Sequence, residues 1–144
     1  MPLLRRSTLL LAVAAATTLG CTDGPTAPVE SGACRTTVGR VGIGDTVTGV
    51  LTRESCRLSD DTYADRWRLS LPSSAIITID LMSDDFDSYL IVRDEAGTDL
   101  VFDDDGGDYP KDARITHGFA AGNYIIVANV YDALVTGAYT LTVQ

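Results

Sequence analysis

The sequence FDSYL at Phe86–Leu90, followed by DDDGGD at Asp103–Asp108, decides the fold class. The two segments place carboxylates and small turn residues at both ends of one short apolar strand, in a chain with a single histidine. Carboxylates crowded into the loops of an all-β domain bind hard cations, cap turns or keep a surface soluble. Catalysis by such carboxylates requires a partner group placed beside them.

From Thr46 onward the sequence has the two-residue hydrophobic period of β-strands. Apolar and polar residues alternate in ITIDL (Ile77–Leu81), and turn sequences such as EAGT and AAGN recur roughly every ten residues. Turn signals at this spacing predict an all-β fold, an antiparallel β-sandwich of about eight strands. The predicted strands are Thr46–Leu51, Arg66–Leu71, Ala75–Leu81, Tyr89–Arg93, Asp99–Asp103, Ala113–His117, Tyr124–Val130 and Tyr139–Val143.

In their order and spacing, these segments resemble the bacterial pre-peptidase C-terminal domain over about residues 45 to 144. FDSYL matches the family's sequence of an aromatic residue, Asp, a small residue, Tyr and Leu, and Asp103–Asp105 falls where the family has Asn-Asp-Asp. The closing strands match at Gly122–Tyr124 and Gly137–Leu141. The resemblance implies a small jelly-roll-like β-sandwich, attached to secreted proteases or found alone in envelope proteins. That family commonly follows a protease domain, but the residues before this domain carry no catalytic pattern, so the resemblance implies no proteolytic activity.

The N-terminus has a basic start at Arg5 and Arg6, then an apolar run and a small-residue end. This is the order of a secretory signal peptide, to which we assign residues 1–20, and the run is too short to span a bilayer. TLGC at Thr18–Cys21 resembles a lipoprotein signal, although Leu19 stands where a small residue is usual. We expect a lipidated Cys21 that anchors the protein to a membrane outside the cytoplasm. The alternative is ordinary secretion of a periplasmic or fully secreted protein.

Residues 21–36 are rich in Pro, Gly and small polar residues, which predicts a flexible tether before a single domain at 37–144. The chain has a net charge of −9, and loss of Arg5 and Arg6 with the signal peptide lowers it to about −11. A surface this negative repels nucleic acid and anionic lipid head groups. We therefore expect no nucleic-acid partner.

Three cysteines are present, and Cys21 is assigned to lipidation. Cys34 and Cys56 remain as an even pair in an oxidising compartment, which predicts a disulfide between them. The alternative of a metal or redox site has no support, because the two cysteines are far apart in sequence and have no CxxC spacing or neighbouring histidine.

Between Asp80 and Asp112 there are 12 acidic residues and only two basic ones. Crowded like charges raise one another's pKa unless a cation or an arginine lies among them. Calcium suits such loops outside the cytoplasm because it accepts six to eight oxygen ligands in loose geometry. The candidate calcium ligands are Asp84, Asp85, Asp87, Asp103, Asp104 and Asp105. In the alternative, Asp87 and Asp104 cap turns and pair with Arg114, while the others are solvated.

Catalytic patterns are weak. His117 is the only histidine, and a triad would need it beside a nucleophile such as Ser83 or Ser88 and an orienting carboxylate. The favoured function is therefore a non-catalytic binding or stabilising module of the cell envelope and not an enzyme. A calcium-stabilised structural domain and a carboxylate-based hydrolase are the alternatives.

Aromatic residues offer a second type of site. Trp67, Tyr89 and two later tyrosines alternate with polar residues along predicted strands, which places them in the core. Tyr109 and Tyr131 lie in predicted loops. These two tyrosines are the candidate ligand surface for an envelope protein or a polysaccharide.

Overall fold

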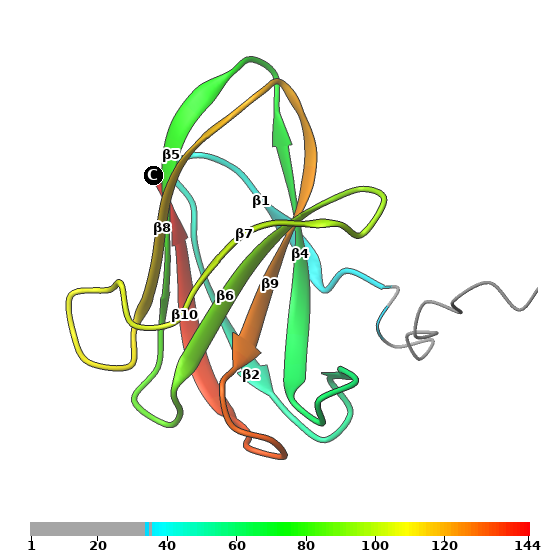
Figure 1. Cartoon of the computed structure of the whole chain (residues 1–144), viewed down its shortest axis with the longest axis vertical. Coiled ribbons are helices and arrows are strands. Elements are labelled where there is room, and N and C mark those ends of the chain that lie inside the picture. The colour runs from blue at the N-terminus through cyan, green and yellow to red at the C-terminus, as the bar shows by residue number, and fades with distance from the viewer. Residues whose placement is uncertain (1–33, 35) are drawn as a thin grey trace, which may run out of the picture.

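The computed structural model describes Cys34 and residues 36–144 (Figure 1). The predicted signal peptide, Cys21 and most of the predicted tether lie outside the described residues. The described part forms ten β-strands, and none of its residues forms a helix long and apolar enough to cross a membrane. The strands are β1 (Gly39–Val41), β2 (Thr46–Leu51), β3 (Cys56–Arg57), β4 (Tyr63–Leu71), β5 (Ala75–Met82), β6 (Ser88–Asp94), β7 (Asp99–Asp103), β8 (Ala113–Phe119), β9 (Gly122–Val130) and β10 (Gly137–Val143).

The all-β class is confirmed, and all eight predicted strands are present. The two additional strands, β1 and β3, are three and two residues long. Segments of this length cannot show a two-residue hydrophobic period, which is why the sequence pattern missed them.

The strands form two sheets packed face to face, as Figure 1 shows. Sheet A is six-stranded in the order β1-β4-β9-β6-β7, with β3 also paired to β4, and sheet B is four-stranded in the order β2-β10-β5-β8. Every pair is antiparallel except β1 with β4, which is parallel. The architecture is therefore a β-sandwich with one parallel edge pair.

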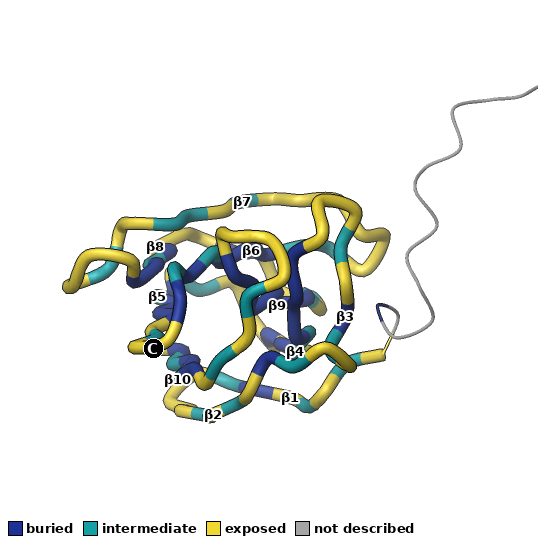
Figure 2. The backbone as a smooth tube through the Cα atoms, turned by 90° about the horizontal axis from the view of Figure 1, so that it is seen from below, coloured by how far each residue is buried: buried dark blue, intermediate teal, exposed yellow. Residues whose placement is uncertain are grey.

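The core lies between the sheets, where buried backbone from both layers meets (Figure 2). On β5, Ile77, Ile79 and Leu81 point inward and are at most 1% exposed. On β6, Leu90 and Val92 are fully buried in the same cluster. Side chains on a strand alternate between the two faces of the sheet, so the residues between these point away from the core.

A buried polar network joins the two sheets. The Trp67 indole Nε1 on β4 donates to the Tyr139 hydroxyl on β10 at 2.9 Å, and that hydroxyl donates to Asp65 Oδ2 at 2.8 Å. Burial raises the pKa of Tyr139, and the Trp67 hydrogen bond opposes this rise. The Tyr139 ring covers Gly49, where a Cβ atom would lie 2.3 Å from the ring and hydroxyl atoms. A glycine at this position lets the ring reach the opposite sheet.

The predicted disulfide between Cys34 and Cys56 is confirmed. Cys34, which lies in the range predicted as tether, is fully buried, and Cys56 begins β3. The bond ties the chain before β1 to the edge of sheet A. For a closed loop of this length the chain-entropy model gives a stabilisation of roughly 3 kcal/mol.

Candidate binding surface

The FDSYL segment joins three parts of the fold. Phe86 and Leu90 are buried in the core. The backbone N–H of Ser88 donates to the carbonyl of Lys111, and the N–H of Tyr131 donates to the carbonyl of Asp87. The loop between β7 and β8 and the loop after β9 are therefore both held to the start of β6.

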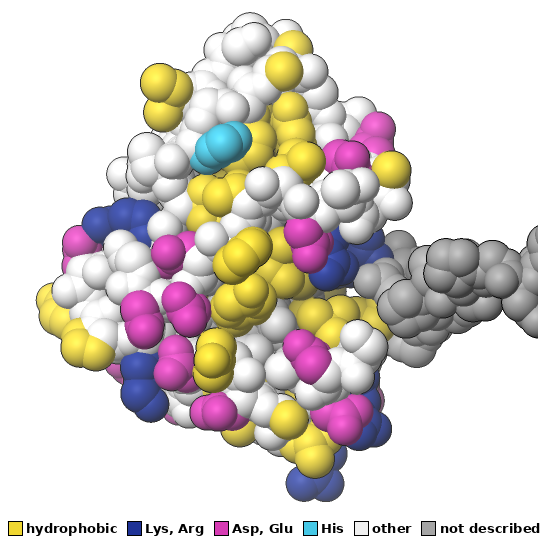
Figure 3. Space-filling model, in the orientation of Figure 1, with side chains coloured by type: hydrophobic (Ala, Val, Ile, Leu, Met, Phe, Trp, Pro, Cys, Tyr) yellow, Lys and Arg dark blue, Asp and Glu magenta, His cyan; other side chains and the backbone are white. Residues whose placement is uncertain are grey.

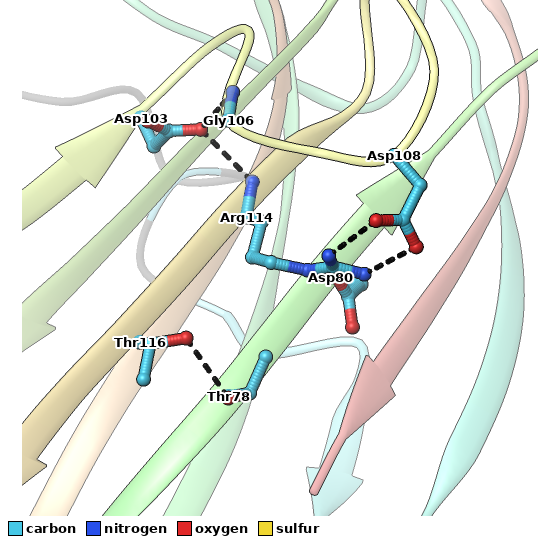
Figure 4. A network of polar contacts seen from close by, with 7 residues as sticks. All are labelled: Thr78, Asp80, Asp103, Gly106, Asp108, Arg114 and Thr116. Atoms are coloured by element: carbon cyan, nitrogen blue, oxygen red, sulfur yellow. Dashed lines mark hydrogen bonds and ion pairs between the residues drawn. The ribbon is translucent and has the colours of Figure 1, made fainter.

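Three of the candidate calcium ligands accept hydrogen bonds from backbone N–H groups. Asp104 Oδ1 accepts from the next residue, Asp105, at 3.0 Å, and Asp103 and Asp85 accept from more distant residues. Asp103 Oδ2 accepts from the backbone N–H groups of Gly106 at 2.7 Å and Arg114 at 2.9 Å, which ties the end of β7 to β8 (Figure 4). Asp85 Oδ2 accepts from the backbone N–H of Ala138 at 2.8 Å. These two carboxylates are engaged in holding loops.

A second group of carboxylates surrounds Asp87. Partial burial raises the pKa of Asp87, as do the nearby carboxylates of Asp105, Asp132 and Asp104, while Lys111 lowers it. Within the described residues, no three or more His, Cys, Asp or Glu side chains converge as metal ligands. The calcium site remains a prediction, and its candidate ligand Asp84 is exposed in the loop between β5 and β6.

Arg114 pairs with different carboxylates from those expected. Its Nε donates to Asp80 on β5, and its two terminal nitrogens donate to Asp108 at 2.6 and 2.8 Å (Figure 4). The alternative to the calcium site, in which Arg114 pairs with Asp87 and Asp104, is therefore wrong on this pairing. Arg114 lies directly across from Asp80 in the β5–β8 ladder, a register that sequence alone did not provide.

The outer face of sheet A carries an aromatic patch formed by Tyr89, Phe102 and Tyr131. The Tyr89 ring centroid lies 6.0 Å from that of Phe102 and 6.2 Å from that of Tyr131. Phe102 is 63% exposed and Tyr131 is 58% exposed. Figure 3 shows hydrophobic side chains running down the middle of this face, over β6, β7 and β9, between carboxylates on both sides.

The prediction that Tyr89 belongs to the core between the sheets is wrong. Tyr89 packs against a second apolar cluster on the outer face, made of Ala64, Ile91, Ile125 and Val127. The sequence SYLIV is apolar on both faces of β6, so alternation could not distinguish the inward side from the outward one. Phe102 was missed as a surface residue because β7 has a similar apolar run, LVF, without alternation.

The patch has an acidic rim and an unsatisfied polar group beneath it. Burial raises the pKa of the Tyr89 hydroxyl, and the carboxylates of Asp104, Asp99 and Asp60 raise it further. Asn129, directly across from Tyr89 on β9, is 1% exposed, and its Oδ1 has no hydrogen-bond partner among the described residues. A buried acceptor left unpaired is unfavourable.

Tyr109 lies apart from this patch. It is 72% exposed and lines a shallow hollow of about 890 Å³ together with Asp84, Asp85 and the backbone near Tyr139. The two predicted ligand-surface tyrosines therefore lie in different places, and Tyr131 has a ring contact with the half-buried Tyr89.

The candidate catalytic residues do not meet. The His117 ring packs edge-on against Phe119, with centroids 4.8 Å apart. Ser83 Oγ donates to the carbonyl of Ala138 at 2.8 Å, and Ser88 is fully buried. Neither serine is hydrogen-bonded to His117 in the described structure.

The fold is similar to the β-sandwich of the pre-peptidase C-terminal domain, in agreement with the resemblance found in the sequence. One solved structure with a similar fold is the pre-peptidase C-terminal domain of a collagenase from Bacillus anthracis. It matches with a TM-score of 0.57 and 18% sequence identity, over 76% of this chain and 98% of that one. At this identity the likeness establishes the fold alone. No family model and no curated protein matches the sequence.

Proposed function

We propose that this protein is a non-catalytic binding module of the cell envelope that holds a partner protein on the outer face of sheet A. The observation that carries the proposal is the aromatic patch of Tyr89, Phe102 and Tyr131 above a second apolar cluster. Exposed apolar patches on single domains mark interaction sites, and aromatic residues dominate the binding energy of protein interfaces.

The charges around the patch favour a basic partner. Asp60, Asp99 and Asp104 lie close enough to Tyr89 to affect its hydroxyl. Arg93 on β6 pairs with Asp99, whereas Asp60 and Asp104 accept hydrogen bonds from Thr62 and Asp105 and have no ion pair with the described residues. Lysine or arginine side chains approaching the patch would meet carboxylates at the rim and aromatic faces in the middle, and both attract cations.

We propose a non-catalytic module because His117 packs against Phe119, and neither Ser83 nor Ser88 is hydrogen-bonded to it in the described structure. This part of the proposal is also supported by the likeness to the pre-peptidase C-terminal domain of a collagenase. A carboxylate-based hydrolase would need one acid with a raised pKa in a closed cleft. Asp87, whose pKa is raised, lies instead among other loop carboxylates at the surface.

The location in the envelope rests on the signal-like N-terminus and on the lipoprotein-like Cys21. The disulfide between Cys34 and Cys56 supports an oxidising compartment. Mass spectrometry of the mature N-terminus tests this part: a diacylated or triacylated Cys21 is expected. A free Cys21 thiol or a cleavage site elsewhere would end the lipoprotein proposal.

The binding function is tested by capture from an envelope extract with the mature domain as bait. We expect a protein that is retained by the wild type and lost by the double variant Phe102→Ser, Tyr131→Ser. The control is Ile76→Ser, which removes an 80% exposed hydrophobic side chain from the outer face of sheet B. Retention by the double variant, or loss by the control, would contradict the proposal. Sedimentation with envelope polysaccharide that depends on the same two residues would replace the protein partner with a glycan.

Calcium is tested separately by calorimetry of the mature domain with calcium and then with a chelator. An ion that binds only the folded state raises the melting temperature by mass action. Extracellular calcium sites have dissociation constants of roughly 0.1 to 1 mM, so an unchanged melting temperature at about 10 mM calcium would exclude a site of this kind.

A further inference from the structure

A hollow of about 380 Å³ lies at the β1–β4 edge of sheet A, away from the aromatic patch. Its polar side chains are those of Arg40, Asp45, Arg68, Ser70 and Asn123. The hollow lies on β1, β4 and the start of β9, whereas the aromatic patch lies on β6, on β7 and just after the end of β9.

Arg40 and Arg68 are directly opposite each other on the parallel strands β1 and β4. Neighbouring strands lie about 4.8 Å apart, so both side chains leave the sheet on the same face as close neighbours. Both are exposed, and among the described residues neither guanidinium has an ion pair or a side-chain hydrogen bond. Like charges directly opposite each other on a sheet are destabilising.

The isolated pair is unexpected because of the charge of the chain. Acidic residues outnumber basic ones by 20 to 11, so two adjacent arginines without a carboxylate partner are not what random placement favours. Asp45 is the only acidic residue in the hollow, and its Oδ2 accepts from the backbone N–H of Gly42 at 2.8 Å. The hollow therefore has two positive charges against one negative charge that is already hydrogen-bonded.

Two further hydrogen-bond donors complete the hollow. Ser70 and Asn123 are directly opposite each other on β4 and β9, two residues along from Arg68 and on the same face. A hydroxyl and a carboxamide both donate to oxygen, and a guanidinium presents two parallel N–H groups that match the oxygens of carboxylate or phosphate.

We propose that this hollow is an oxyanion-binding site in which Arg40 and Arg68 hold a carboxylate or phosphate group of a ligand, with Ser70 and Asn123 as additional donors. An oxyanion between the two guanidiniums removes their repulsion and uses their free N–H groups. The site needs neither the aromatic patch nor its partner, so it stands or fails independently of the proposed function.

The test is a nuclear magnetic resonance titration of the arginine Nε–H signals in the mature domain at low ionic strength. The probes are inorganic phosphate and, separately, glucuronate. We expect saturable shifts of the Arg40 and Arg68 signals, and tighter binding of one probe identifies which group the natural ligand carries. Absence of a saturable shift with either probe up to about 50 mM overturns the proposal, because charge-assisted pairs bind oxyanions more strongly than this.

Variants separate a built site from general electrostatic attraction. Arg40→Gln and Arg68→Gln should each weaken binding about tenfold or more, while Arg53→Gln, which removes the same charge from an exposed turn, should change it less than about twofold. Equal weakening by Arg53→Gln would overturn the proposal. The melting temperature of each variant checks that the fold is retained.

Discussion

The two outer faces of the sandwich differ in how they use their polar groups. On sheet B the Thr78 and Thr116 hydroxyls are hydrogen-bonded across β5 and β8 at 2.9 Å, and Arg114 pairs with both Asp80 and Asp108. This face satisfies its own charges and hydroxyls by cross-strand pairing.

On the outer face of sheet A, several side chains have no partner among the described residues. Phe102 is largely exposed, Asn129 Oδ1 is buried without a hydrogen bond, and Arg40 and Arg68 lack a counter-ion in the described structure. One fold thus has a self-contained face and an open face. Binding should therefore be sought on the open face of sheet A.

The largest expected effect distinguishes the inner side of sheet A from its outer side. Leu90→Ala on β6 empties a fully buried core position and should lower the free energy of unfolding by roughly 2 to 5 kcal/mol. Phe102→Ala on neighbouring β7 removes a mostly exposed ring and should change it by about 0.5 kcal/mol or less. Urea unfolding measures both values. Similar losses for the two variants would mean that the aromatic patch stabilises the fold, and the contrast between the faces would fail.

The next effect concerns the self-contained face of sheet B. Arg114→Met keeps the aliphatic stem but leaves Asp80, which is 6% exposed, without its guanidinium partner. Because a buried carboxylate without a partner is costly, the melting temperature should fall more than for Arg57→Met, which breaks the exposed pair with Asp61. Equal melting temperatures for these two variants would show that the Asp80 pair does not stabilise sheet B.

Much of the fold could be predicted from sequence because its strongest signals are local. Alternation in ITIDL placed Ile77, Ile79 and Leu81 inward, and all three are buried. The even cysteine pair predicted the disulfide. The two short strands could not be predicted, because β1 and β3 form through pairing with β4 and not through their own periodicity.

The candidate site was less accessible to sequence reasoning. Tyr131 was predicted as a surface residue, but Tyr89 and Phe102 were not, because the strands that carry them, β6 and β7, each contain an apolar run without alternation. The adjacency of Arg40 and Arg68 depends on the parallel β1–β4 register, which brings together residues 28 positions apart. Long-range register, and not residue type, was the missing information.

A smaller effect tests the unpaired arginines on the open face. Arg68→Gln removes the repulsion with Arg40, so at low salt it should raise the free energy of unfolding by roughly 0.2 to 1 kcal/mol. The gain should shrink at about 1 M sodium chloride, where charges are screened within about 3 Å. Thermal unfolding with Arg53→Gln as the control measures this. A loss of stability at low salt would indicate that Arg68 already has a stabilising contact.

The smallest expected effect concerns Asp87, where the FDSYL segment meets the acidic loops. Burial and the carboxylates of Asp105, Asp132 and Asp104 raise the folded-state pKa of Asp87 above its ordinary value of 3.8. The protonated carboxyl therefore favours the folded state, and this contribution is present below 3.8 and is lost as pH rises through the folded-state pKa.

Asp87→Asn should consequently be slightly more stable than the wild type at neutral pH, and the difference should vanish as pH falls below the ordinary value of 3.8. Glu95→Gln makes the same charge change in an exposed turn and serves as the control. Melting temperatures measured across this pH range, without and with calcium, decide the outcome. A neutral-pH gain that is no larger than the control's would contradict the crowding of carboxylates at Asp87. A gain that reverses when calcium is added would instead locate a cation among Asp87, Asp104 and Asp105, because the substitution then removes a ligand as well as a charge.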